Sequence, residues 1–522
     1  MELDLGDVQG WTSTHKIISL SAIVAASLAL YNLGLSIYRL FFSNISGFPG
    51  PKIAAATYLY EFYYDWLLSG KYIFVIEEMH KKYGPIVRIN PDELSISDPD
   101  FYSELYVSES RRRTNGYHGF TEGLGLGQAH VATTSHDLHR LRRKPMEPFF
   151  SRLGVSRSWP DIAEVVESFA RRIESLKGTG SVIRFDHACS AFAGDVIGQI
   201  CFNKEQKLLE DPDFTPEWYK MFRMANHSIP LLHLFPWITK TMTWIPESIM
   251  LWIFPTGQMI KEIKKLALQH IIKVKKESSD GHKPKNGDSK GSGTLFHHVL
   301  DSDMPESELS DERLACEAQV ILGAATITTG ATIAYISYYI LARPDIRLKL
   351  QEELKDFMVA WPQQVPTMAG LEQLPYLQAL IKEGLRHSSA VMHRLPRVSP
   401  DVPVQYKQWT IPVGVPVGMS AYYMHTDPSV YEAPFEFIPE RWLGEVHPNM
   451  NRNFVPFCRG SRGCLGMSLA LAELSFILAV LYRPSGPKLE LFETDESDVI
   501  HVHDFIIPAP KLSSKGIRVL VR

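Results

Sequence analysis

The segment Phe457–Gly466 (FCRGSRGCLG) constrains this chain more than any other. Cys464 directly precedes a helical pattern over residues 465–481. Free N–H groups and the dipole at a helix start stabilise a thiolate, which is the form of cysteine that binds metals. Gly460 and Gly466 let the backbone turn sharply or approach a bound group closely. The segment therefore predicts a metal-binding thiolate, and a buried structural cysteine in a Gly/Arg loop is the alternative.

The cysteine content and the charge argue against two classes of protein. The 522 residues include five cysteines, which are few, odd in number and without framework spacing, so we expect a reducing compartment and no disulfide scaffold. The net charge of -4 means that the chain lacks the excess of basic residues that is typical of nucleic-acid-binding proteins. Apolar residues make up 45% of the chain, which is enough to fill a large core.

The N-terminal region contains one uncharged apolar stretch, Ile17–Tyr38, between Lys16 and Arg39. At ~1.5 Å per helical residue it can cross a hydrocarbon core of ~30 Å. We therefore predict a short tail over residues 1–16, a transmembrane anchor over 17–38, a proline-rich hinge over 39–51 and a single catalytic domain over 52–522. Basic residues after the span favour a cytosolic main body. A buried core helix is the alternative to the anchor.

The rest of the chain shows no repeat and no second domain linker, and it is mainly helical with small β-sheets. Ser310–Leu341 predicts one long helix, and Arg347–Phe357 and Leu377–His387 are amphipathic. Short strands are expected at residues 85–90, 94–97 and 409–413. Lys275–Gly293 predicts an exposed flexible loop.

The cysteine loop resembles the haem-binding loop of the cytochrome P-450 superfamily. Three further segments resemble family motifs in the family's order: Glu383-Gly-Leu-Arg386, Pro439–Trp442 and His139–Arg143. The resemblance runs from about residue 48 to the end. It is closest to filamentous-fungal enzymes of secondary metabolism, of the trichodiene-oxygenase-like group, through residues 89–106, 136–151 and 382–400.

The resemblance assigns roles to these motifs. It implies that Cys464 is the axial ligand of the iron of haem b, where a thiolate favours cleavage of O2. It implies a structural ion cluster of Glu383, Arg386 and Arg441, although a surface helix pair is the alternative for the first two. It also implies a set of haem-contacting residues, which comprises His139, Arg143, Arg397, Phe457, Arg462, Cys464 and Gly466.

The basic run around Arg143 has a second interpretation as a solvated surface. We expect Arg140 and Lys144 to be solvated and to belong to a docking surface for an acidic redox partner.

The long helix departs from the family pattern. Ala324-Ala-Thr-Ile-Thr-Thr329 places Thr328 where the family has its oxygen-activating threonine, but Ala325 replaces a glycine and Ile327 replaces an acid. Isoleucine carries no exchangeable proton, so we expect proton delivery through water or a substrate group. Two alternatives are less conventional oxidative chemistry and threonines that only bond back to the preceding helical turn.

The substrate pocket is expected to be apolar, since Ala324, Ala325 and Ile327 would form its distal wall. We therefore predict that the substrate is a lipophilic terpenoid, polyketide or alkaloid intermediate. Leu231–Pro255 is rich in aromatic residues and is either an interfacial segment or buried core. The resemblance adds five residues to the pocket, namely Phe120, Val391, Met392, Phe505 and Ile506.

The predicted function is that of a haem-thiolate monooxygenase. No dinucleotide fingerprint follows a predicted strand, so electrons must come from another protein. The resemblance implies a membrane-bound NADPH–cytochrome P-450 reductase, with a cytochrome b-type protein as a second donor, and a single-pass endoplasmic reticulum enzyme that faces the cytosol. The alternatives are a haem-thiolate isomerase, dehydratase or oxidative cyclase that uses a peroxide or rearranges its substrate, and a non-catalytic haem-binding membrane protein.

Overall fold

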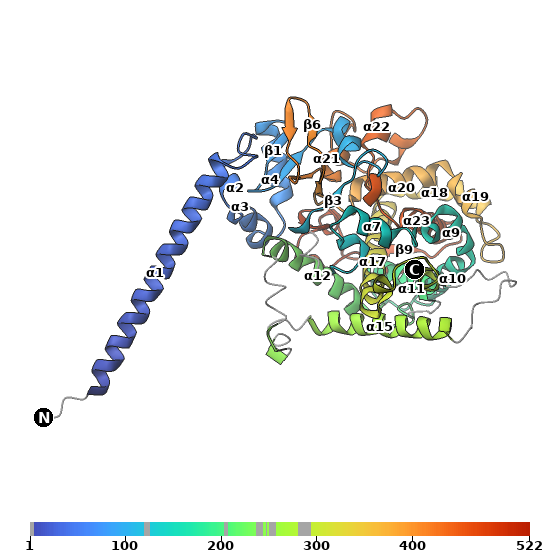
Figure 1. The fold of residues 1–522 in the computed structure, drawn as a ribbon. Coiled ribbons are helices and arrows are strands. Elements are labelled where there is room, and N and C mark those ends of the chain that lie inside the picture. The colour runs from blue at the N-terminus through green and yellow to red at the C-terminus, as the bar shows by residue number, and fades with distance from the viewer. Residues whose placement is uncertain are drawn as a thin grey trace.

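The structure is a computed structural model that describes residues 5–119, 126–202, 207–235, 244–246, 248–249, 257–279 and 294–522. Helix α1 (Leu5–Phe41) projects away from the body of the molecule (Figure 1). Its segment Ile18–Phe41 has a mean hydropathy of 1.8, and no residue of its apolar window is buried inside the protein. This helix is long and apolar enough to span a bilayer, and it extends beyond both ends of the predicted span 17–38.

The segment that follows α1 is docked on the body. The Arg88 side chain donates to the carbonyl oxygen of Arg39 at 2.8 Å, and the Arg88 amide donates to that of Pro49 at 2.7 Å. Gly50 has a φ of +153°, and a Cβ there would lie 2.5 Å from the Arg88 carbonyl oxygen, so only glycine fits. The proline-rich segment is therefore held against strand β1 (Ile86–Arg88).

Helix α17 (Asp311–Ala342) runs through the middle of the body and confirms the predicted long helix. Its length and apolar composition would also suit a membrane span, but 78% of that window is buried inside the protein. It packs against α11 (Phe185–Phe202), α15 (Gly257–Ser279), α20 (Pro375–Ser388) and α23 (Met467–Tyr482). Helix α11 is buried on all faces, and most of its side chains are apolar or small.

Further helices surround this centre (Figure 1). The longer ones are α4 (Tyr72–Tyr83), α7 (His136–Arg143), α10 (Trp159–Glu174), α12 (Pro216–Leu234) and α18 (Pro344–Phe357). Short α-helices are α2 (Lys52–Ala56), α3 (Leu59–Phe62), α5 (Tyr102–Leu105), α8 (Glu147–Phe150), α9 (Arg152–Arg157), α16 (Leu295–Leu300), α19 (Met368–Glu372), α21 (Ala421–His425) and α22 (Pro448–Asn453). The described residues also form a π-helix, η1 (Tyr63–Leu67), and the 3-10 turns η2 (Pro99–Phe101), η3 (His130–Ala132), η4 (Glu306–Leu309), η5 (Pro439–Trp442), η6 (Gly460–Arg462) and η7 (Glu496–Asp498).

The strands form small sheets. The largest has the order β1-β2-β8-β5-β3, in which only the pair β2–β8 is parallel. Its register places Arg397 opposite both Gly116 and Val417. The remaining strands form a sheet of order β4-β12-β9 and the hairpins β6–β7 and β10–β11. The strands after β1 are β2 (Leu94–Ile96), β3 (Asn115–Gly116), β4 (Ile183–Arg184), β5 (Arg397–Val398), β6 (Val404–Tyr406), β7 (Trp409–Ile411), β8 (Pro416–Gly418), β9 (Leu489–Leu491), β10 (His503–Phe505), β11 (Ile507–Ala509) and β12 (Arg518–Val521).

The predicted mainly helical class with small sheets is confirmed. Helices α17, α18 and α20 and strands β1, β2 and β7 occupy the expected segments, but each strand is shorter than its pattern. The loop predicted over Lys275–Gly293 is partly wrong, because α15 continues to Ser279; residues 280–293 lie outside the described residues. Most of Leu231–Pro255 also lies outside them, and within its described part Trp244 is 86% exposed.

Candidate active site

The loop before α23 holds Cys464 in a fixed turn. The Cys464 amide donates to the carbonyl oxygen of Phe457 at 2.8 Å, and η6 lies between these two residues. Gly460 has a φ of +75°, and a Cβ there would lie 2.3 Å from the carbonyl oxygen of Val107, so this contact requires glycine. Gly466 is the N-cap of α23, which places Cys464 just before the helix as predicted.

The thiol of Cys464 is surrounded by protein and still accessible. Its residue is exposed, whereas Cys189 and Cys201 are buried and Cys316 and Cys458 are half-buried. Burial nevertheless raises the pKa of the Cys464 thiol, and the opposing Gly466 amide and Arg143 do not outweigh burial. The helix start lowers this pKa as expected, through the Gly466 amide, but its effect is smaller than that of burial. Accessible surface combined with desolvation indicates a thiol that lines a hollow inside the protein.

A stripe on α17 has the same character. Ala324 is exposed, and Val320, Thr328 and Ala331 are half-buried, although most of the helix is buried. Their spacing of three and four residues places them on one face of the helix. The Thr328 hydroxyl donates to the carbonyl oxygen of Ala324 at 2.9 Å, which is the back-bonding expected as an alternative, and its oxygen can still accept a hydrogen bond.

The predicted distal wall needs correction. Ile327 is only 6% exposed, and Ala325 packs against the main hydrophobic core. Helical periodicity places these two residues on either side of the accessible stripe, so Ala324 alone of the three predicted wall residues lies on it. Val320 and Ala331 were missed, although their spacing from Thr328 in the sequence could have identified them.

Three arginines lie in or beside the cysteine loop, and His139 lies near them. Arg143 of α7 donates to the carbonyl oxygen of Gly463 at 2.7 Å and to the Glu147 carboxylate at 2.9 Å. Arg462 of η6 donates to the carbonyl oxygens of Thr133 and Thr134 at 2.7 and 2.8 Å. The Arg397 guanidinium of β5 lies 5.3 Å from the centre of the Tyr106 ring.

These cations repel one another. Burial lowers the pKa of Arg462 to about 9, and Arg397 and Arg143 lower it further. Burial also lowers the pKa of His139 to about 2, with contributions from Arg462, His130 and Arg143. Within the described part of the chain, neither Arg397 nor Arg462 forms an ion pair, and Nδ1 of His139 is buried without a hydrogen-bond partner. A ligand with carboxylates bound here would offset the repulsion between the arginines and give Nδ1 of His139 a hydrogen-bond partner.

Glu383, Arg386 and Arg441 form a buried ion cluster. The Glu383 carboxylate accepts from Arg386 at 2.7 and 2.9 Å and from Arg441 at 3.1 Å. It also accepts from the indole of Trp442 at 2.9 Å, a partner that the sequence did not reveal. Burial acts to raise the pKa of Glu383, but the two guanidiniums outweigh it and the pKa is lowered.

The five pocket residues suggested by the resemblance behave differently. Phe120 lies outside the described residues. The Met392 amide donates to the Ile506 carbonyl oxygen at 3.2 Å, so the two segments that contain the other four residues meet. Val391 and Ile506 are half-buried, but Met392 is fully buried in the second hydrophobic core and Phe505 packs against His227. Placing Met392 in the pocket is therefore wrong, because its side chain points into the core under the sheet.

The basic run is only partly solvated. Lys144 is exposed as expected. Arg140 instead pairs with Glu109 at 2.5 Å and with Glu147 at 2.7 Å, so its charge is neutralised within the protein. The expectation of a free basic surface at Arg140 is wrong.

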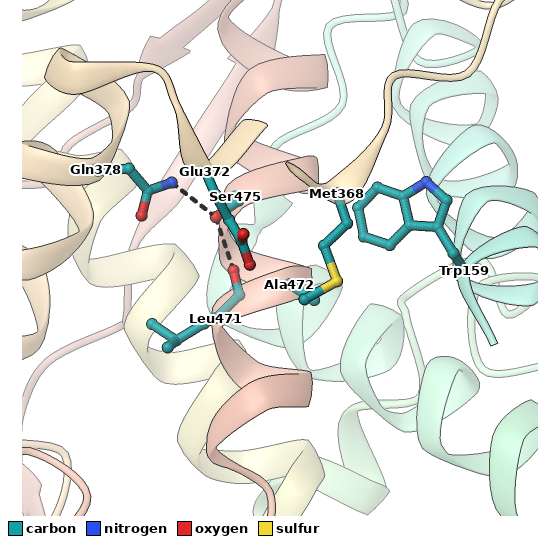
Figure 2. A pocket seen from close by; sticks show the side chains of 7 residues that line it. All are labelled: Trp159, Met368, Glu372, Gln378, Leu471, Ala472 and Ser475. Atoms are coloured by element: carbon teal, nitrogen blue, oxygen red, sulfur yellow. Dashed lines mark hydrogen bonds between the residues drawn. The ribbon is translucent and has the colours of Figure 1, made fainter. Parts of the chain in front are cut away.

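A cavity of about 230 Å³ lies elsewhere, between α10, α19, α20 and α23 (Figure 2). Met368 and Trp159 lie on one side of it, and Gln378 donates to the Ser475 hydroxyl at 3.2 Å. The Ser475 hydroxyl in turn donates to the carbonyl oxygen of Leu471 at 2.8 Å. None of the site residues above lines this cavity, so it is not the candidate active site.

The chain is similar to known proteins over most of its length. The family model described as Cytochrome P450 matches residues 60–483. The chain is 50% identical to a cytochrome P450 monooxygenase, oblB, of Emericella variicolor, over 98% of this chain and 95% of that one. It is 47% identical to a fusicoccadiene C-8 hydroxylase of Phomopsis amygdali over 93% of both chains. It is 42% identical to a stellatic acid synthase of Emericella variicolor, over 97% of this chain and 96% of that one.

Proposed function

The chain belongs to the cytochrome P450 family and is a haem-thiolate monooxygenase of the kind found in fungal secondary metabolism; from this premise we propose that Cys464 is the thiolate ligand of its haem. The observation that carries the assignment is the accessible thiol of Cys464. Of the five cysteines, it alone is exposed, and Arg143 binds the residue directly before it. Cys458, the other cysteine in the loop, packs against the second core.

The residues present fit a haem. Arg143, Arg397 and Arg462 would hold its propionates as cations, and His139 as a neutral hydrogen-bond donor, since Arg397 and Arg462 form no ion pair among the described residues and His139 Nδ1 has no hydrogen-bond partner there. Phe457 and Gly466 would lie beside the thiolate on its side of the ring. When bound, the haem supplies the redox chemistry by which O2, two electrons and two protons give one inserted oxygen atom and one water. The ion cluster of Glu383, Arg386 and Arg441 would hold the scaffold and take no part in the chemistry.

The stripe on α17 would face the substrate. Ala324 and Ala331 leave room for a bulky molecule, and Thr328 offers the polar atom of this face. We assign Thr328 the role of accepting a hydrogen bond from water at its Oγ1, while its own hydroxyl proton is donated in a hydrogen bond to the Ala324 carbonyl oxygen. Because Ile327 has no exchangeable proton, that water or a substrate group must bring protons to the site.

The substrate proposed is a lipophilic polycyclic terpenoid. The relatives named fusicoccadiene C-8 hydroxylase act on a compound whose name denotes a hydrocarbon with two double bonds. A hydrocarbon suits an alanine-lined face better than a nitrogen-containing alkaloid or a polar polyketide would. We propose hydroxylation of such a ring system as the reaction of this chain.

The proposed setting is the endoplasmic reticulum membrane. Residues 17–38 would form a single transmembrane anchor after the tail 1–16, residues 39–51 a hinge, and residues 52–522 a cytosolic catalytic domain. Monooxygenases of this family need a redox partner, and we propose a membrane-bound NADPH–cytochrome P450 reductase, with a cytochrome b-type protein as a second donor.

The test is the difference spectrum of the reduced, carbon monoxide-bound protein, with Cys464→Ala and Cys458→Ala variants. We expect the long-wavelength band of a thiolate-ligated complex in the wild type and in Cys458→Ala, and its loss in Cys464→Ala. A band that survives in Cys464→Ala, or is missing from haem-loaded wild type, would overturn the assignment.

One observation favours a second candidate. Ile327 stands where the family has an acid, so a haem-thiolate isomerase, dehydratase or oxidative cyclase is the alternative. Product formation that requires NADPH and reductase supports the monooxygenase. Consumption of an added lipid peroxide without reductase supports a peroxide-using isomerase or dehydratase.

A further inference from the structure

A buried carboxylate on α17 pairs with a histidine from the opposite side of the site. We propose that Glu317 and His130 are positioning residues that complete the propionate-binding edge of the haem site, with His130 as a further polar contact for that edge. The inference rests on the proposed haem function. Neither residue belongs to a sequence motif, and they are 187 positions apart in the chain.

Glu317 is fully buried and fully bonded. Its carboxylate bonds to Nδ1 of His130, accepts the His130 amide at 3.1 Å and accepts Nη2 of Arg313 at 2.7 Å. Burial acts to raise the pKa of Glu317, but His130 and Arg313 outweigh it, so the pKa is lowered and the group is ionised. An ionised carboxylate that hydrogen-bonds to both the ring and the backbone of one residue fixes that residue's position and ring orientation.

Glu317 also lies on the accessible face of α17. It precedes Ala324 by seven residues, so the two side chains lie on the same side of the helix, about 10 Å apart along its axis. Glu317 therefore lies at the N-terminal end of the stripe that contains Ala324 and Thr328. His130, which bonds to Glu317, lies near that end of the stripe and beside His139.

His130 keeps one polar atom available. Its Nδ1 is engaged by Glu317, but no described residue hydrogen-bonds its Nε2, and this atom is not among the fully buried ones. The His130 ring lies 5.9 Å from the ring of His139 at an angle of 43°. His139 has its own Nδ1 buried without a partner among the described residues. Two neighbouring imidazoles, one with a buried nitrogen that lacks a partner and one with an accessible nitrogen, lie beside three arginines and point to a shared anionic ligand.

The loop after His130 links the two walls of the site. Glu317 holds its start, and Arg462 of the cysteine loop binds the carbonyl oxygens of Thr133 and Thr134 at its end. Arg142 of α7 adds a bond to the Thr133 hydroxyl at 2.8 Å. A shift of this loop would therefore move Arg462 and the first turn of α7, which carries His139.

The test compares full-length holoenzymes. Glu317→Gln removes the charge and keeps the shape, and His130→Gln keeps a side-chain donor for Glu317 but removes the ring. Glu308→Gln is the matched control, because Glu308 binds Arg142 at 2.7 Å and lies 3.5 Å from Arg313 but does not contact His130. The measurements are the rate of haem transfer to excess apomyoglobin and the midpoint potential of the ferric–ferrous couple.

We expect both Gln variants at positions 317 and 130 to lose haem about fivefold faster, the equivalent of one hydrogen bond. The potential of His130→Gln should also become more negative, because a less compensated propionate favours the ferric state, whereas the lost negative charge of Glu317→Gln acts in the opposite direction. Glu308→Gln should leave both quantities unchanged. A lower melting temperature in His130→Gln with unchanged haem transfer and potential would overturn the proposal and leave only a structural pair. Retention of the thiolate–carbon monoxide band in each variant separates these results from a failure of the proposed function.

Discussion

Arg143 of α7 donates from Nη1 to the carbonyl oxygen of Gly463, the residue directly before Cys464, at 2.7 Å. Its Nε binds the Glu147 carboxylate at 2.9 Å. One guanidinium therefore connects a helix on one side of the site to the peptide that presents the thiol. A planar fork can serve both partners at once, which the single ammonium of lysine cannot do in the same geometry.

Arg143→Met is therefore expected to weaken haem retention. The change removes one cation from the propionate cluster and frees the Gly463 carbonyl group, so a smaller fraction of the purified protein should show the thiolate–carbon monoxide band. Arg140→Met is the control, because Arg140 also pairs with Glu147 but makes no bond to the cysteine loop. Equal haem content in the two variants would contradict this role of Arg143.

Glu383→Gln is expected to destabilise the protein by about 3–5 kcal/mol, the usual cost of breaking a buried ion pair. Two guanidiniums would lose their only shared carboxylate in a site without solvent. The measurement is the free energy of unfolding by denaturant in detergent. Glu352→Gln, in an exposed pair with Lys355, serves as the control and should change nothing measurable. A small effect at position 383 would mean that Trp442 and the amide of Ile438 suffice to hold the neutral side chain.

Part of this site was predictable from the sequence because its parts are local. The cysteine loop, the Glu383–Arg386 pair and the bounds of α17 depend on spacings of a few residues, which a sequence shows directly. The Glu317–His130 pair and the Arg140–Glu109 pair join distant segments, and no local pattern marks them.

Side-chain direction was the other source of error. Val391 and Met392 are neighbours in a segment without regular secondary structure, and Val391 is half-buried whereas Met392 is fully buried. A one-residue choice therefore decided which of them could reach the pocket, and Met392 points into the second core. On α17, Ile327 lies one residue before Thr328, and this difference of one position takes it off the accessible stripe.

Ile327→Glu tests how protons reach the site. The new carboxyl group would replace a side chain that is 6% exposed, so burial should raise its pKa and leave it able to donate near neutral pH. We expect the ratio of product formed to NADPH consumed to change relative to the wild type. Ile327→Leu keeps the position apolar and should leave this ratio unchanged. The same ratio in Ile327→Glu would count against a water route that the acid can replace.

His425 should give the fold a specific pH dependence. Burial lowers its pKa to about 3, with a further contribution from Arg386, and its Nε2 accepts the amide of Val455 at 3.0 Å. In the unfolded chain the pKa of histidine is about 6.5, so between these values only the unfolded state binds the proton. Stability is therefore complete above pH 6.5 and falls as the pH drops below it.

The check is the denaturant midpoint at pH 7 and pH 5. His425→Gln can still accept the Val455 amide but does not titrate, so its midpoint should fall less than that of the wild type over this interval. Parallel curves for the two proteins would show that other buried histidines, such as His139 and His501, cause the acid sensitivity.

Ala324 and Ala318 offer a direct test of which face of α17 borders the hollow. Ala324 is exposed, whereas Ala318, on the same helix, is fully buried. Ala324→Leu should leave the free energy of unfolding nearly unchanged, because the added atoms enter open space, and it should abolish the spectral shift that a terpenoid hydrocarbon produces in the wild type. Ala318→Leu should destabilise the protein by about 1–3 kcal/mol, the usual cost of overpacking a core. A comparable stability loss in both variants would mean that Ala324 does not face a cavity, and the substrate site would then have to lie against another element.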